Sequence, residues 1–150
     1  MLFALLMMFL LALATQRVMA VVSQQAQRER EAELLRVGSA IAAAIGRYHE
    51  GTPGTVKRWP SSLEDLLDDR RMIGLRRHLR EVYADPITRQ PRWGLVAAPD
   101  GGIAGVYSLG GGVPITSGSL EAVRWGFAGA TSYQQWRFVY VPTLPQAARP

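Results

Sequence analysis

The 150-residue chain contains no cysteine, and this absence excludes both a disulfide framework and a thiolate metal site. Histidine occurs twice, at His49 and His78, and neither has a second metal ligand at a useful helical spacing. For each we predict a surface position without a metal-binding or acid–base role. Lysine occurs once, at Lys57, so arginine carries nearly all the positive charge behind the net charge of +5. The arginines are scattered along the chain, and we expect no nucleic-acid partner.

Motifs that support catalysis are also missing. There is no Gly-x-Ser-x-Gly turn, and Ser108 has the wrong spacing for one. The glycine run at 110–112 lacks the Lys and Ser/Thr of a phosphate-binding loop. A cluster of four carboxylates is formed by Glu64, Asp65, Asp68 and Asp69. We interpret it as a solvated face that pairs with Arg70 and Arg71. The sequence therefore predicts no enzyme, no cofactor and no metal.

The first 22 residues are almost entirely apolar. They contain 19 apolar side chains, interrupted only by Thr15, Gln16 and Arg17. A membrane-spanning helix needs about 20 apolar residues, and an arginine near its end can reach the headgroups. Three interpretations compete: a retained anchor, a signal peptide cleaved near Ala12-Leu13-Ala14, and a chain whose true start lies upstream of Met1.

Residues 23–50 contain no proline and begin with strong helix formers. A charged collar follows the apolar segment and contains Arg28, Glu29, Arg30 and Glu31. One face then carries apolar residues that we expect to pack against a globular head: Leu34, Ile41, Ile45 and Tyr48. Only two glycines interrupt the predicted helix from Leu2 to Tyr48. This continuity favours a retained anchor, which predicts a single-pass inner-membrane protein with a periplasmic C-terminal head.

Residues 51–142 should form that head, followed by a flexible tail at 143–150. Ser61 and Glu64 have the spacing of a capping box, so we predict a helix at 63–70. A second helix is predicted at 71–83. Segments rich in aromatic and branched residues predict strands at 92–98, 103–109 and 136–142, the first two joined by a turn at 99–102. The predicted fold class is α+β, with a long N-terminal helix packed on a small antiparallel sheet.

Two stretches of the head, together with the bipartite helix, resemble a known family. They are RYHEGTPGTVKRWPSSLEDLLDD and REVYADPITRQPRWGLVAAPDGGIAGVYSLG. The chain is similar over residues 1–141 to type IV pilins and type II secretion pseudopilins, and looks most like the branch related to the major pseudopilin. The resemblance implies a pilin-like fold and a structural subunit of a type II secretion pseudopilus. It also implies self-assembly with other pseudopilins on an inner-membrane secretion platform, with lipid around the apolar segment.

The resemblance assigns roles to two sets of residues. Membrane and filament packing would fall to Leu5, Leu6, Met8, Phe9 and Leu10, and the register between subunits to Arg28, Glu29, Arg30 and Glu31. Two family features are missing: the Gly-Phe-Thr-type peptidase site, and the acidic calcium loop, since 109–120 contains no carboxylate. We expect the peptidase site to lie upstream of Met1; otherwise the chain is a divergent member that cannot be processed. The alternatives are a type IV pilus or DNA-uptake subunit, and an anchored periplasmic binding or adaptor domain that does not polymerise.

Overall fold

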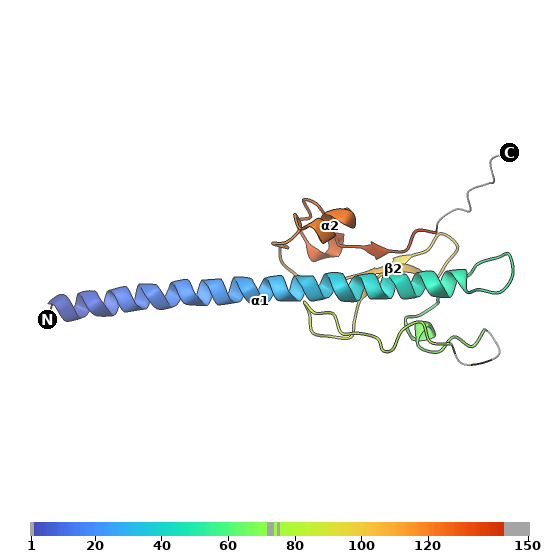
Figure 1. Ribbon diagram of the computed structural model, residues 1–150, viewed down its shortest axis with the longest axis horizontal. Helices are drawn as coiled ribbons and strands as arrows, with labels where there is room; N and C mark the ends of the chain where they lie inside the picture. The colour runs from blue at the N-terminus through green and yellow to red at the C-terminus, as the bar shows by residue number, and fades with distance from the viewer. Residues whose placement is uncertain (1, 72–73, 75, 143–150) are drawn as a thin grey trace.

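One continuous helix, α1 (Leu2–Glu50), forms a third of the protein. The computed structural model describes residues 2–71, 74 and 76–142, without the side chains of 12–20; the predicted tail at 143–150 lies outside the described residues. At 1.5 Å per residue, α1 is about 70 Å long. Its first half projects beyond the rest of the molecule, and its second half lies along the head (Figure 1). The predicted uninterrupted helix is confirmed.

A small antiparallel sheet packs on the second half of α1. It consists of β1 (Gly94–Ala97), β2 (Ile103–Tyr107) and β3 (Phe138–Val139), in the order β1-β2-β3. The hairpin of β1 and β2 is confirmed, with Leu95 opposite Val106. The third strand is shorter than predicted and pairs with β2 only at Phe138 and Val139. The fold class is therefore α+β, with a long N-terminal helix and three strands.

The core lies between this sheet and one face of α1. The four residues assigned to head packing, Leu34, Ile41, Ile45 and Tyr48, are 0, 0, 0 and 7% exposed. From the sheet side, Phe138 is fully buried and its ring lies against Gly38 of α1. A side chain at Gly38 would overlap that ring, so glycine permits the close approach of helix and sheet.

Neither short helix predicted at 63–83 forms as expected. In place of a helix at 63–70 there is a single 3-10 turn, η1 (Glu64–Leu66). The Asp65 carboxylate, not a Ser61–Glu64 capping box, accepts the backbone N–H groups of Ser61 and Ser62, at 2.8 and 3.1 Å. These local bonds compete with the helical pattern.

The described residues of 71–83 are not helical. The Leu66 carbonyl accepts the backbone N–H groups of His78 and Leu79, at 2.8 and 3.0 Å, and Asp69 forms an isolated bridge with Arg76. These backbone groups are therefore bonded to the segment 66–69 and not to neighbours one helical turn away. A tertiary pairing replaces the local helix that the apolar spacing predicted.

A short helix, α2 (Leu120–Arg124), follows the loop at 110–119 and was not predicted. The Ser119 side chain caps it by accepting the N–H of Ala122 at 3.3 Å. A serine placed directly before Leu-Glu-Ala is a helix-start signal, so the sequence did contain the information. A 3-10 turn, η2 (Tyr133–Gln135), then leads into β3.

Candidate assembly surface

The first half of α1 exposes a continuous apolar surface. Within 2–11, nine large apolar side chains are between 49 and 86% exposed. They include the five residues assigned to membrane and filament packing: Leu5 65%, Leu6 55%, Met8 70%, Phe9 61% and Leu10 52%. A helix that is apolar on every side is normally buried, and large exposed apolar patches mark interaction sites. No described residue of the head covers this half of α1 (Figure 1).

The expected membrane anchor is not supported. Within the part of the chain that the structure describes, no helix combines the length and the apolar character that crossing a membrane requires. The prediction of a single-pass inner-membrane protein with a periplasmic head is therefore wrong for this structure. The helical length is present in α1, and the sequence argument had accepted Thr15, Gln16 and Arg17 as an interruption near the end of the span.

The charged collar divides into exposed and buried members. Arg28, Glu29 and Arg30 are exposed, and Glu29 accepts a hydrogen bond from Gln25 one turn earlier, at 3.0 Å. Their side chains are free to meet a neighbouring molecule. Glu31 is different, because it is fully buried inside this chain. The grouping of Glu31 with a surface collar is corrected by this burial.

Glu31 fastens the head to α1. Its carboxylate accepts the backbone N–H groups of Ile115 and Thr116, at 3.0 and 2.8 Å, and the Thr116 hydroxyl. It also accepts the Tyr133 hydroxyl at 2.7 Å and the Gln27 amide at 3.0 Å. Three segments far apart in sequence therefore meet at one side chain. Glu31 lies three residues before Leu34, on the face of α1 that packs against the head. This helical spacing could have predicted that Glu31 is buried.

These bonds set the ionisation of the carboxylate. Burial by itself raises the pKa of Glu31, but the hydrogen bonds from Thr116, Ile115 and Tyr133 outweigh it, and the pKa lies below its ordinary value. For Tyr133, burial together with the bond to Glu31 raises the pKa to about 12. Glu31 is therefore an ionised acceptor and Tyr133 a neutral donor at neutral pH.

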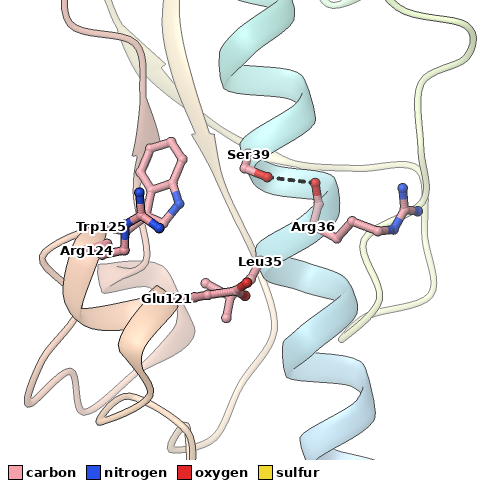
Figure 2. A pocket seen from close by; sticks show the side chains of 6 residues that line it. All are labelled: Leu35, Arg36, Ser39, Glu121, Arg124 and Trp125. Carbon is pink, nitrogen blue, oxygen red and sulfur yellow. Dashed lines mark hydrogen bonds between the residues drawn. The ribbon is translucent and has the colours of Figure 1, made fainter.

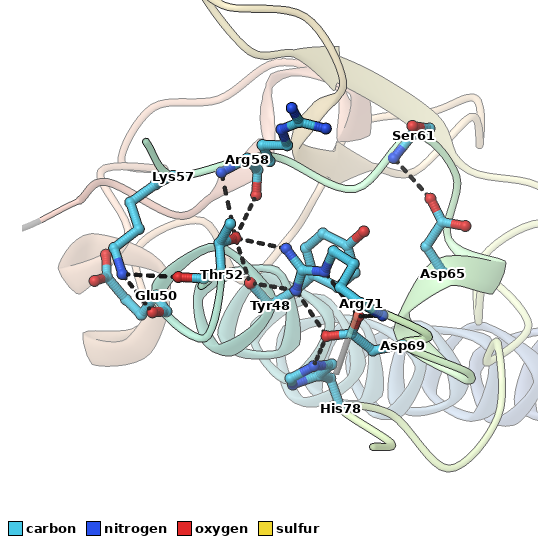
Figure 3. Close-up of polar contacts among 10 residues, drawn as sticks. All are labelled: Tyr48, Glu50, Thr52, Lys57, Arg58, Ser61, Asp65, Asp69, Arg71 and His78. Atoms are coloured by element: carbon cyan, nitrogen blue, oxygen red, sulfur yellow. Dashed lines mark hydrogen bonds and ion pairs between the residues drawn. The ribbon is translucent and has the colours of Figure 1, made fainter. Parts of the chain in front are cut away.

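A second polar cluster closes the C-terminal end of α1. Arg71 donates to Asp69 at 2.7 Å and to the Tyr48 carbonyl at 2.8 Å, and its guanidinium lies 3.4 Å from the centre of the Tyr48 ring. Figure 3 shows Asp69 between Arg71 and His78. The His78 ring nitrogen is 2.9 Å from the Asp69 carboxylate. A cation therefore neutralises both the buried aspartate and the carbonyl end of the helix.

This cluster corrects two sequence interpretations. Asp69 is 2% exposed and thus is not part of a solvated acidic face, although it does pair with Arg71. The bond from Arg71, aided by His78, holds the pKa of Asp69 far below its usual range despite the opposing effect of burial. Neither histidine is at the surface: His49 is 8% exposed and lies 4.2 Å from the Trp59 ring, and the His78 side chain is 9% exposed.

A recess of about 550 Å³ lies where α2 approaches α1. Figure 2 shows Glu121 directed from α2 toward Leu35 of α1, with Trp125 at the end of α2. Arg36 points away from α2 and is bonded to Glu33, at 2.6 Å. The lining of the recess therefore mixes one carboxylate and two arginines, Arg36 and Arg124, with the apolar side chains of Leu35 and Trp125. Among the described residues, no three His, Asp or Glu side chains are grouped so that they could hold a metal ion.

Comparison with known proteins does not assign a family. No family model, no curated protein and no solved structure matches the chain. The argument for function therefore depends on the residues and their geometry.

Proposed function

We propose that the protein is a structural subunit of a pilin-like filament of the type II secretion pseudopilus kind, assembled through the apolar half of α1. The observation that carries this proposal is one uninterrupted helix with two different environments. Its second half is buried in the head, and its first half exposes nine large apolar side chains. The layout agrees with the pilin plan that the sequence resembles.

The exposed half of α1 provides a strong driving force for association. Full burial of a Leu, Phe or Met side chain contributes about 1.5–3 kcal/mol. Since each of the nine side chains is between 49 and 86% exposed, their burial would contribute on the order of 10 kcal/mol before the cost of association. Copies of the same segment offer a matching apolar surface at the required length. Self-assembly is thus the arrangement that covers the segment from end to end.

Rigid attachment of the head favours a filament over a tethered domain. A tether needs only a flexible connection, whereas a filament subunit must hold its head at a fixed angle to the packed helix. Here the four hydrogen bonds from the head to Glu31, and the buried residues Leu34, Ile41 and Ile45, fix that angle. The exposed charges of Arg28, Glu29 and Arg30 lie where the free half of α1 meets the head. We propose that they set the register between neighbouring subunits.

A charge placed in the apolar half tests the proposal. In Leu6→Asp, the carboxylate must enter the packed helices, so we expect assembly of the purified full chain to be lost. The matched control is Leu95→Asp, because Leu95 is 51% exposed, against 55% for Leu6, but lies on the head. Electron microscopy and analytical sedimentation after detergent removal measure assembly. Filaments from Leu6→Asp as abundant as those of the wild type would contradict the proposal.

The collar is tested separately by a double variant, Arg28→Glu with Arg30→Glu. Both side chains are exposed, so the fold should be retained. We expect fewer or irregular filaments, because reversed charges disturb the pairing with Glu29 of a neighbour. Glu29→Arg in the same chain restores opposite charges and should recover assembly in part. Unchanged filaments in the double variant would contradict the proposed role of these charges in subunit register, but would not affect the proposed packing through the apolar half of α1.

A further inference from the structure

A recess on the head, separate from the assembly surface, gathers arginines without acidic partners. It has a volume of about 420 Å³ and lies between the second half of α1 and the segment 77–83. Three guanidinium groups line it, from Arg47 of α1 and from Arg77 and Arg80. No carboxylate is among its lining residues. Its size falls in the range of small-molecule sites.

The backbone that presents these arginines is fixed at several points. His78 and Leu79 donate their N–H groups to the Leu66 carbonyl, and Leu79 is 6% exposed in the core. The His78 ring is bonded to Asp69, and the Tyr83 carbonyl accepts the indole N–H of Trp93 at 2.8 Å. The segment 78–83 is therefore held in place although it is neither helix nor strand. Arg77 and Arg80 project from a preformed support, which reduces the cost of ordering them around a ligand.

The positive charge in the recess is not neutralised within the described chain. Arg47 donates to the His78 carbonyl at 2.7 Å, which holds its guanidinium beside the segment without any ion pair. Arg77 and Arg80 are exposed and pair with no described carboxylate. Two acids of the adjoining segments do not line the recess: Asp69 is bonded to Arg71 and His78, and Glu81 is exposed.

We propose that this recess binds a phosphate group, held by Arg77 and Arg80 together with Arg47. Three guanidiniums around one recess repel each other, and a dianion relieves that repulsion. Guanidinium groups also donate paired N–H bonds that match the oxygens of phosphate. The Tyr83 ring, stacked near the Arg36 guanidinium at 5.7 Å, adds an aromatic wall beside the charged groups. The site is independent of the assembly surface at the other end of α1.

The test is a titration of the ¹⁵N-labelled full chain, kept in a neutral detergent at constant ionic strength. The arginine Nε–H signals are followed by NMR while inorganic phosphate or glycerol 3-phosphate replaces chloride. We expect saturable shifts that are largest for Arg47, Arg77 and Arg80. Equal affinity for both probes would identify the bare phosphate group as the ligand. Tighter binding of glycerol 3-phosphate would identify a phosphate ester.

Two double variants that change the net charge by the same amount distinguish a specific phosphate site from general electrostatic attraction. Arg77→Glu with Arg80→Glu should weaken phosphate binding at least tenfold, because two of the three donors are removed. Arg92→Glu with Arg124→Glu, at exposed positions outside the recess, should change it less than twofold. Arg77→Gln with Arg80→Gln repeats the test without charge reversal if the first variant fails to fold. Linear shifts without saturation, or equal losses in both Glu variants, would overturn the proposal.

Discussion

Replacing Glu31 by alanine should be among the most destabilising changes in the chain. The substitution removes the acceptor for the N–H groups of Ile115 and Thr116 and for the Tyr133 hydroxyl, all in a site where Glu31 is fully buried. Leaving one buried donor without a partner costs about 1–3 kcal/mol, and breaking a buried charged network about 3–5 kcal/mol. Because the donors share one site and can relax together, we expect a loss of about 3–5 kcal/mol in the free energy of unfolding.

Two companion variants separate hydrogen bonding from other effects. Glu31→Gln keeps the volume and one acceptor oxygen, but its amide N–H₂ faces donors, so an intermediate loss of about 1–3 kcal/mol is expected. Glu29→Ala removes a carboxylate from an exposed position two residues away and should stay within about 0.5 kcal/mol of the wild type. Urea unfolding of the full chain, followed by the fluorescence of its four tryptophans, measures each value. A Glu31→Ala variant as stable as Glu29→Ala would refute the assignment of Glu31 as the fastening point.

Three further predictions concern the head. The lowered pKa values of Glu31 and Asp69 mean that their stabilisation is complete above their unfolded values of about 4 and is lost as pH falls through the folded values. Acid titration of stability should therefore show a steep loss below about pH 4 that is shallower in Asp69→Asn; an unchanged slope would contradict the role of Asp69. Gly38→Ala should destabilise by about 1–2 kcal/mol, because overlap with the buried Phe138 ring outweighs the gain in helix propensity, whereas a stabilised variant would show that the ring can move away. Ile41→Ala should cost about 2–5 kcal/mol by leaving a cavity in the core, and a near-zero loss in a thermal melt would show that the wrong face of α1 had been chosen.

The sequence predicted those parts of the fold that depend on local patterns. The α1 helix follows from its helix formers and from the absence of proline, and Leu34, Ile41 and Ile45 share a face by spacing alone. The hairpin followed from branched and aromatic residues on either side of a glycine-rich turn. In these cases the local sequence pattern and the tertiary structure favour the same conformation, so the pattern alone is sufficient to predict it.

The features that could not be predicted depend on contacts between distant segments. The spacing of apolar residues at 71–83 suggested a helix, but the carbonyl of Leu66 takes the N–H groups of His78 and Leu79. The buried ionised side chains also depend on distant partners: Glu31 is bonded to Thr116 and Tyr133 across the head, and Asp69 is bonded to His78 as well as to the nearby Arg71. From charge alone, such residues look like solvated surface groups. Glu31 carried one usable signal, its position on the apolar stripe.

The most direct test of the central claim is whether the apolar half of α1 contacts the same segment of another copy. Since the chain has no cysteine, a single introduced cysteine is a unique probe. Five variants replace the predicted packing residues one at a time: Leu5→Cys, Leu6→Cys, Met8→Cys, Phe9→Cys and Leu10→Cys. A bifunctional thiol cross-linker is added to assembled full-length protein, with Leu95→Cys as the similarly exposed control on the head. The account predicts cross-linked dimers from the five helix variants, at yields well above the control. Helix variants that stay monomeric, or that cross-link no more than Leu95→Cys, would contradict it.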